Sequence, residues 1–258
     1  MHKSARDRVG FTLIELSVVL LIIGLIAGSI LVGRDLIKIA QIRKAISQEE
    51  EMQTAMGAFK LKYGQLPGDC QQGSDIWPDA VNGNANGFIE GGYNDFENPE
   101  LNLYEAYNMW HHLMRAELVP YHYVPVSSFP LPAGQNFALP LALENTYLTA
   151  RADKVISVSL PYTNYFMISG VNLALAPLGF LNYLLIYSGM DKRAGLLPVD
   201  AKSIDTKIDD GKPFSGQTLS LWTLTDFPDL SCTPTNGKNA YDVKNPNFNC
   251  GVFIRFAQ

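Results

Sequence analysis

The feature that most limits how this chain can fold is a long apolar segment near its N-terminus. Residues 11–33, FTLIELSVVLLIIGLIAGSILVG, contain a single ionisable side chain, Glu15. At about 1.5 Å per residue, a helix of this length spans the roughly 30 Å hydrocarbon core of a bilayer. The segment runs directly into a second helical pattern and lacks the small-residue cleavage site that ends an ordinary secretory signal. We therefore expect a retained transmembrane anchor.

Basic residues before the anchor predict its orientation. The first ten residues, MHKSARDRVG, include Lys3, Arg6 and Arg8. Positive charge beside a membrane span favours the cytoplasmic side, so the long C-terminal portion is expected on the other side. In a bacterium this describes a single-pass protein of the inner membrane with its globular part in the periplasm.

Glu15 places a carboxylate in the first turns of an apolar helix, where a charge is costly and needs a partner. A free α-amino group, exposed by a cut just before Phe11, would be a suitable partner on a neighbouring helix because opposite charges offset the desolvation cost. The alternative is that Glu15 reaches the membrane interface as a charge without a role.

The sequence GFTLIEL followed by this apolar run resembles the cleavage and methylation motif of type IV prepilins and type II secretion pseudopilins. The resemblance covers residues 1 to about 35 closely and continues in pattern to about residue 63. It implies cleavage between Gly10 and Phe11, N-methylation of Phe11, and a role for Glu15 in docking each subunit onto a filament. The partners it implies are other pilin or pseudopilin subunits, a prepilin peptidase, an inner-membrane assembly platform and membrane lipid; a pilus subunit would become extracellular after assembly.

One departure from many pilins is the lack of a proline between Phe11 and Leu66. Gly24, Gly28 and Gly33 would loosen the helix instead, at up to about 1 kcal/mol each relative to alanine. Close packing of small residues between helices is the alternative explanation for these glycines.

From residue 34 to residue 63 the pattern becomes amphipathic, which predicts a helix with one face packed on a domain. Its apolar residues, spaced mostly by three or four, are Leu36, Ile39, Ile42, Ile46, Met52, Met56, Phe59 and Tyr63. The acidic run Glu49–Glu51 interrupts this stripe and is expected on a solvated face. The predicted organisation is a leader at 1–10, a transmembrane half-helix at 11–33, an amphipathic half-helix at 34–63 and a globular domain at 64–258.

The rest of the chain predicts an α+β, pilin-like fold, in which the long helix packs on a C-terminal antiparallel sheet with additional short helices. Gly64 and Pro67 should end the long helix. Helices are expected at 99–118, and from Pro198 to a stop at Gly211. Short apolar or alternating runs predict strands at 155–160, 165–169, 183–187, 219–224 and 252–256.

Three cysteines are too few for a disulfide framework. Cys232 and Cys250 bracket a loop rich in Pro, Asn and Gly that a disulfide would close, the alternative being two free thiols. Cys70 is left over, either buried as a small apolar residue or competing for one of these partners.

Two segments carry residue types found at cation sites. Asn82, Asn84, Asn86 and Glu90 have the spacing of the first part of a calcium-binding EF-hand loop, although Tyr93 stands where a bidentate Glu belongs; an Asn/Gly turn cluster is the alternative. The aspartates of PVDAKSIDTKIDDGKPFSG, Asp205, Asp209 and Asp210, would either touch a cation or cap the loop, and capping is preferred. This second segment also resembles part of some large prepilin-like proteins.

Charge and motifs restrict the function classes. The net charge of −5 becomes −7 without the leader, which holds three basic residues and one acid, so no broad contact with nucleic acid is expected. His111 and His112 are adjacent on a helix and cannot form an i,i+4 zinc pair; they are expected to be ordinary surface or partly buried side chains. There is no G-x-S-x-G, P-loop or H-E-x-x-H motif, and an enzyme is not expected.

The sequence therefore favours a structural subunit, a minor pilin or pseudopilin, with no required cofactor. A filament-displayed adhesin or ligand-binding pilin is the alternative, because the loops at 70–98 and 231–250 would offer a binding surface.

Overall fold

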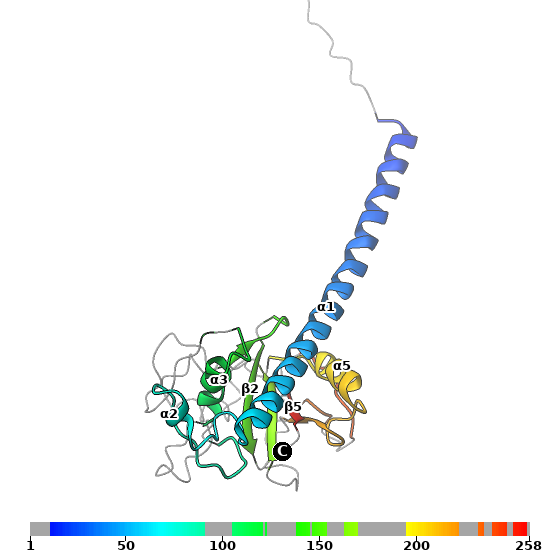
Figure 1. Cartoon of the computed structure of the whole chain (residues 1–258). Coiled ribbons are helices and arrows are strands. Elements are labelled where there is room, and N and C mark those ends of the chain that lie inside the picture. The colour runs from blue at the N-terminus through cyan, green and yellow to red at the C-terminus, as the bar shows by residue number, and fades with distance from the viewer. Residues whose placement is uncertain are drawn as a thin grey trace, which may run out of the picture. The chain divides into compact units, whose positions relative to one another are not determined.

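The computed structural model of the chain describes residues 11–90, 105–120, 122, 138–144, 146–153, 163–169, 195–221, 232–234, 239–246 and 250–256. Two compact units divide the chain between Gln41 and Ile42. The first is the N-terminal half of a long helix, and the second combines the rest of that helix with an antiparallel sheet and short helices (Figure 1). The α+β layout predicted from the sequence is present.

Helix α1 spans Leu13–Tyr63 without interruption. It begins at Leu13, directly after Thr12, and it ends where Gly64 adopts a left-handed φ of 77° while its N–H donates to the carbonyl of Lys60. Glycine tolerates that conformation, so the helix stop predicted at Gly64 is confirmed.

Burial along α1 begins at Ile42 and defines one stripe. Its apolar members are Ile42, Ala45, Ile46, Met52, Ala55, Met56 and Phe59. Leu36 and Ile39 were predicted to belong to the same stripe but are exposed. Glu49, Glu50 and Glu51 were all predicted to lie on a solvated face. Glu50 and Glu51 are exposed as predicted. The prediction for Glu49 was wrong, because Glu49 lies within the stripe and is buried.

The sheet has five strands in the order β1-β2-β3-β5-β4, and every neighbouring pair is antiparallel. The strands are β1 Leu139–Pro140, β2 Tyr147–Asp153, β3 Thr163–Ser169, β4 Thr218–Leu221 and β5 Gly251–Arg255. The outer edge of β1 is covered by the Gln48 side chain of α1. The Gln48 amide donates to the carbonyl oxygen of Pro140 at 3.3 Å and accepts from the N–H of Ala142 at 2.8 Å.

Residues on the two faces of the sheet belong to different cores. Phe166, Ile168, Val252 and Ile254 share the main core with the buried stripe of α1. The alternate residues Tyr165, Met167, Leu219 and Phe253 form a second, smaller cluster. This alternation is the two-residue period of a strand with apolar residues on both faces.

Three short helices complete the described part of the domain: α2 Gly73–Ile76, α3 Glu105–Arg115 and α5 Pro198–Ile208. Helix α3 contacts β2, and α5 contacts β4 and β5 (Figure 1). Helix α3 ends before the predicted residue 118 because Glu117 takes a left-handed φ of 61°, and the Leu118 N–H returns to the Leu113 carbonyl. The helix predicted from Pro198 is confirmed.

The strand predictions had mixed outcomes. Those at 165–169, 219–224 and 252–256 overlap β3, β4 and β5. Strand β2 was missed. The strands predicted at 155–160 and 183–187, like the first residues of the helix predicted from 99, lie outside the described residues.

Candidate functional site

The first turn of α1 holds Glu15 through contacts within the same turn. Thr12 is the residue before the helix, and its backbone N–H and Oγ1–H both donate to Glu15 Oε2 at 2.8 Å. The Glu15 N–H donates in return to Thr12 Oγ1 at 3.3 Å. This reciprocal pairing of Thr and Glu three residues apart is a capping box, which satisfies helix N–H groups that have no partner in the preceding turn.

The surface that follows this turn is apolar and open. An 18-residue window of α1 has a mean hydropathy of 2.7 with none of it buried, so by length and composition the helix is able to cross a membrane. Phe11, at the start of the segment, is 81% exposed. The hydroxyls of Ser17 and Ser29 donate to carbonyls within their own helix, of Ile14 and Leu25. The polar groups near the start are thus bonded locally, as lipid requires. Gly10 lies outside the described residues.

The Asn/Gly loop near residues 82–90 is organised by two carboxylates together with its own asparagine side chains, which accept from the N–H groups of Asn86 and Phe88. Glu105, at the start of α3, accepts from the N–H groups of Asn84 and Glu90 at 3.0 and 2.9 Å. Asp69 accepts from the N–H groups of Asn86 and Gly87 at 3.1 and 2.8 Å. Burial raises the pKa of Asp69, and raises that of Glu105 to about 7.

The four predicted calcium ligands do not converge on one point. The side chains of Asn84 and Asn86 both donate through Nδ2 to Glu90 Oε2, at 2.9 and 2.8 Å. The Oδ1 of Asn82 instead accepts from the N–H of Ser74. Calcium is bound by oxygen atoms, whereas here N–H groups face the carboxylates. The arrangement is that of an Asn/Gly turn cluster, the alternative given by the sequence. Tyr93 lies outside the described residues.

His111 and His112 are buried, contrary to the sequence prediction. The Gly68 N–H donates to His112 Nδ1 at 2.9 Å, so Nε2 carries the hydrogen and donates to the Val81 carbonyl at 3.0 Å. Burial lowers the His112 pKa to about 4, which keeps the ring neutral. His111 Nε2 lies 3.4 Å from Asp79, which also pairs with Arg115. The two rings therefore fix loop 68–81 to α3.

Gly68 is required by this packing. Its φ is 87°, and a Cβ there would overlap the carbonyl oxygen of Glu105. A side chain at this position would be strained in the backbone and would also push the loop away from α3.

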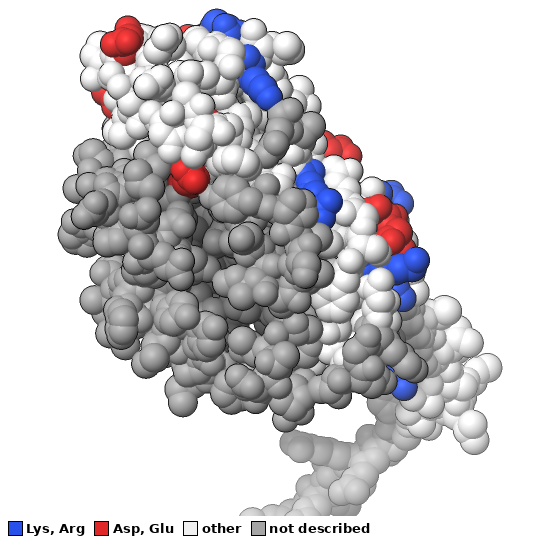
Figure 2. All heavy atoms as spheres, turned by 90° about the horizontal axis from the view of Figure 1, so that it is seen from below, with Lys and Arg blue, Asp and Glu red and all other residues white. Residues whose placement is uncertain are grey.

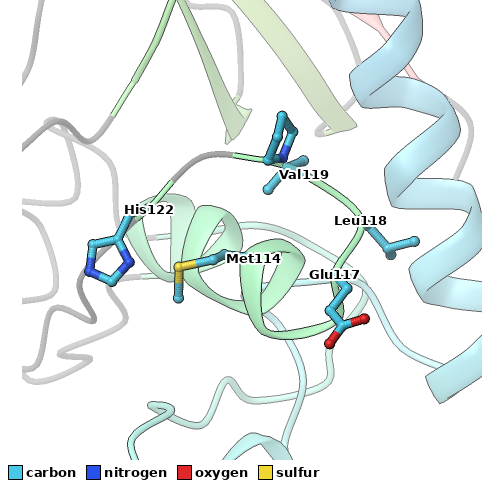
Figure 3. Close-up of a pocket in the computed structure, with 6 residues that line it drawn as sticks. Met114, Glu117, Leu118, Val119 and His122 are labelled. Atoms are coloured by element: carbon cyan, nitrogen blue, oxygen red, sulfur yellow. The ribbon is translucent and has the colours of Figure 1, made fainter.

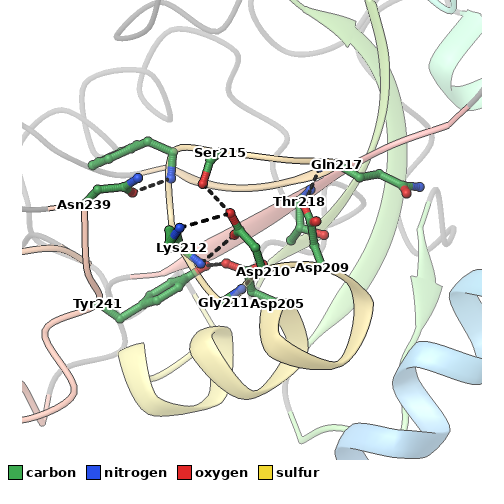
Figure 4. Close-up of polar contacts among 11 residues, drawn as sticks. Asp205, Asp209, Asp210, Gly211, Lys212, Ser215, Gln217, Thr218, Asn239 and Tyr241 are labelled. Carbon is green, nitrogen blue, oxygen red and sulfur yellow. Dashed lines mark hydrogen bonds and ion pairs between the residues drawn. The ribbon is translucent and has the colours of Figure 1, made fainter.

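The aspartates at the end of α5 form the one group of three or more potential metal-ligand side chains within the described part of the chain, with ligand atoms within 4.8 Å of one another. Asp205 accepts from the Tyr241 hydroxyl at 2.7 Å and the Gly211 N–H at 3.2 Å (Figure 4). Asp209 accepts from the N–H groups of Gln217 and Thr218. These donors close the loop between α5 and β4, which is the capping role that the sequence favoured.

The Asp205–Tyr241 contact lies in the same buried region as the disulfide. Cys232 and Cys250 are bonded with their Cα atoms 5.0 Å apart. Tyr241 stands within the loop that they close, and burial raises the pKa of Asp205 to about 6. The remaining cysteine, Cys70, is a buried free thiol. The disulfide and the aspartate together hold the loop against α5 and β4.

A pocket of about 520 Å³ lies at the end of α3. Its lining comes from the last turn of the helix and the segment after it (Figure 3): Met114, Glu117, Leu118, Val119, Pro120 and His122. On the face of the molecule shown in Figure 2, described acidic and basic side chains are interspersed.

Comparisons of this chain with family models, with curated proteins and with solved structures gave no match.

Sequence reasoning missed Asp69 and Glu105 as the residues that organise the Asn/Gly loop. The only local signal was their position beside turn residues, after Gly68 in one case and in the first turn of α3 in the other. Their partners lie 15 to 21 residues away along the chain, a distance over which helix and strand periodicity carry no information.

Proposed function

We propose that the chain is made as a type IV prepilin-like precursor, is cut between Gly10 and Phe11, and serves as a membrane-anchored structural subunit of a pilus or secretion pseudopilus. The observation that carries this proposal is one uninterrupted helix with two different halves. Its first half exposes apolar side chains and carries an acid, Glu15, at the third helical residue, and its second half has one stripe buried in an α+β domain.

The chemistry of Glu15 supports this role. Its carboxylate already accepts two hydrogen bonds from Thr12, which reduces the cost of carrying it into lipid. Thr12 provides no positive charge. The α-amino group of a neighbouring processed subunit, freed at Phe11, would supply that charge and pair subunits in register.

The size of the chain favours a less abundant subunit. After removal of the leader, 248 of the 258 residues remain. This is larger than many major pilins, so we propose a minor pilin or pseudopilin, with other such subunits, a prepilin peptidase, an inner-membrane assembly platform and membrane lipid as partners.

Quantitative mass spectrometry of sheared filaments and of the membrane fraction tests the assignment. A peptide that begins with methylated Phe11 in filaments would identify a pilin, and its ratio to other subunits would separate major from minor. The processed peptide in the membrane fraction alone would favour a pseudopilus. An unprocessed N-terminus in both fractions would refute the proposal.

The docking role has its own test. Glu15→Ala should be processed normally but lost from filaments, because the pairing charge is gone. Glu50→Ala is the matched control, since Glu50 is an exposed acid of the same helix and should be incorporated as in the wild type. Normal incorporation of Glu15→Ala would remove the docking role while leaving processing intact.

A filament-displayed ligand-binding pilin is the second candidate, and the pocket at the end of α3 is the observation that favours it. Its lining combines apolar side chains such as Leu118 with the polar Glu117 and His122, so it suits a ligand that has both apolar and polar groups. Leu118→Asp should then abolish adhesion without reducing the amount of subunit in filaments. Equal adhesion by both proteins would reject this pocket as the binding site.

A further inference from the structure

Glu49 occupies the middle of the buried stripe of α1. Ile46 lies before it and Met52 after it, one helical turn away in each direction, and both belong to the main core. Glu49 itself is only 1% exposed. The neighbouring residue Gln48 is hydrogen-bonded to Pro140 of β1 and to Ala142, which follows that strand, so this turn of α1 is held against the edge of the sheet.

The polar partner of the Glu49 side chain is a neutral amide. Gln53, one turn further along α1, donates through Nε2 to Glu49 Oε1 at 2.5 Å. A carboxylate buried with one neutral donor is poorly compensated, because a buried charge needs an opposite charge or several donors.

Among the side chains that the structure describes, none of those packed in this core brings a positive charge to Glu49. Strands β1, β3 and β4 contain no acidic or basic residue. Arg151 of β2 and Arg255 of β5 are both in register with Tyr165, on the face of the sheet opposite the main core, and Asp153 of β2 is in register with Thr163. The ionisable groups of α3 nearest the core are Glu105, His111 and His112, which bind the loop at 68–90. Helix α5 contributes two buried acids, Asp200 and Asp205. Among the described residues, the charged neighbour that acts on Glu49 is the like-charged Glu50.

This environment disfavours the charged form. Burial raises the Glu49 pKa to about 7, with a smaller contribution from Glu50, while the Gln53 hydrogen bond opposes the rise. In an unfolded or undocked helix the pKa returns to its ordinary value near 4.5. The stabilising effect of the neutral acid is therefore complete below about pH 4.5, and it is lost as the pH rises through about 7.

We propose that Glu49 makes the docking of the amphipathic half of α1 on the sheet proton-dependent, so that the buried stripe is held firmly when this carboxyl group is neutral and loosens when it ionises. Gln48 and the apolar residues of the stripe position the helix, and Glu49 sets the pH range over which the contact is strong. This inference concerns a conformational property of the domain and does not rest on the proposed function.

Hydrogen exchange of the full chain in detergent micelles tests the proposal. Protection of amides 45–59, corrected for intrinsic exchange, should fall by at least about tenfold between pH 5.5 and pH 8.5, since one pKa unit corresponds to about a tenfold change in equilibrium. In Glu49→Gln and in Glu49→Met, which has an uncharged unbranched side chain of similar length, the same amides should stay protected at pH 8.5. Glu50→Gln is the matched control and should lose protection as the wild type does.

The outcomes separate clearly. Retained protection in both Glu49 variants, with loss in the wild type and in Glu50→Gln, supports the proposal. An equal loss in wild type and in either folded Glu49 variant would overturn it, as would a wild-type profile without pH dependence. Trp77 and Trp110 lie within the domain, so tryptophan fluorescence verifies that each variant is folded.

Discussion

The two halves of α1 form one continuous helix, yet different interactions stabilise them. From Leu13 to Gln41 apolar side chains are exposed, and the side-chain hydrogen bonds join residues three or four positions apart. From Ile42 onward the apolar side chains are buried, and contacts such as that of Gln48 with Pro140 join residues far apart in sequence. Each half also carries one acid in an apolar setting, Glu15 in the first and Glu49 in the second. Both halves therefore have the same helical periodicity but different surroundings. Apolar side chains of the second half stabilise the domain, whereas those of the first half remain exposed, where lipid or partners can contact them.

The largest expected effect contrasts one apolar residue from each half. Phe59 is fully buried and packs against Tyr63 and His112, so Phe59→Ala should lower the free energy of unfolding by about 3–5 kcal/mol. Leu20 is 68% exposed, and Leu20→Ala should change the same quantity by less than about 0.5 kcal/mol. Urea unfolding in micelles, followed by tryptophan fluorescence, measures both. A similar loss from the two variants would contradict the division of α1.

A second prediction concerns pH and is confined to the domain. His112 has a pKa lowered to about 4 in the folded state, so its contribution to stability is present above the ordinary value near 6.5 and is lost as pH falls through about 4. The expected loss is about 3 kcal/mol. Glu49 and Glu105, whose pKa values rise to about 7, act in the opposite direction.

Comparison with His112→Gln isolates this effect from the two acids. The variant should be less stable near pH 7, and its stability should decline less than that of the wild type between pH 6.5 and pH 4.5. Hydrogen exchange in the apolar half of α1 should depend on pH in the same way in the wild type and in His112→Gln. If the stability of the two proteins changed equally with pH, His112 would be excluded as the source of the pH dependence.

The smallest expected effect is a gain. Glu117 follows α3 in a left-handed conformation that glycine adopts with less strain, so Glu117→Gly should stabilise the domain by about 1 kcal/mol. Glu117→Ala keeps the unfavourable backbone geometry and serves as the matched control. Thermal unfolding of both variants measures the difference, and an equal melting temperature would show that the turn is not strained.

Much of α1 could be predicted from the sequence because helical periodicity and Gly64 are local signals. The same periodicity contained the correct position of Glu49, since residues 42, 46, 49, 52, 56 and 59 follow one another by three or four. Because Glu49 stands next to Glu50 and Glu51, it was instead predicted to share their solvated face. The Asn/Gly loop could be predicted only in part. Its turn residues are a local signal, but the carboxylates of Asp69 and Glu105 are distant in sequence and contact the loop only in the folded chain.

Gln48 has a consequence beyond holding α1. Its amide occupies the donor and acceptor positions on the outer edge of β1 that an additional strand would use. An unprotected sheet edge is a template for strand addition and aggregation. If this chain polymerises through its helix, as proposed, its sheet must not pair with the sheets of other chains as well. The Gln48 side-chain amide takes the place of a backbone peptide group at this edge and so blocks the addition of a strand there.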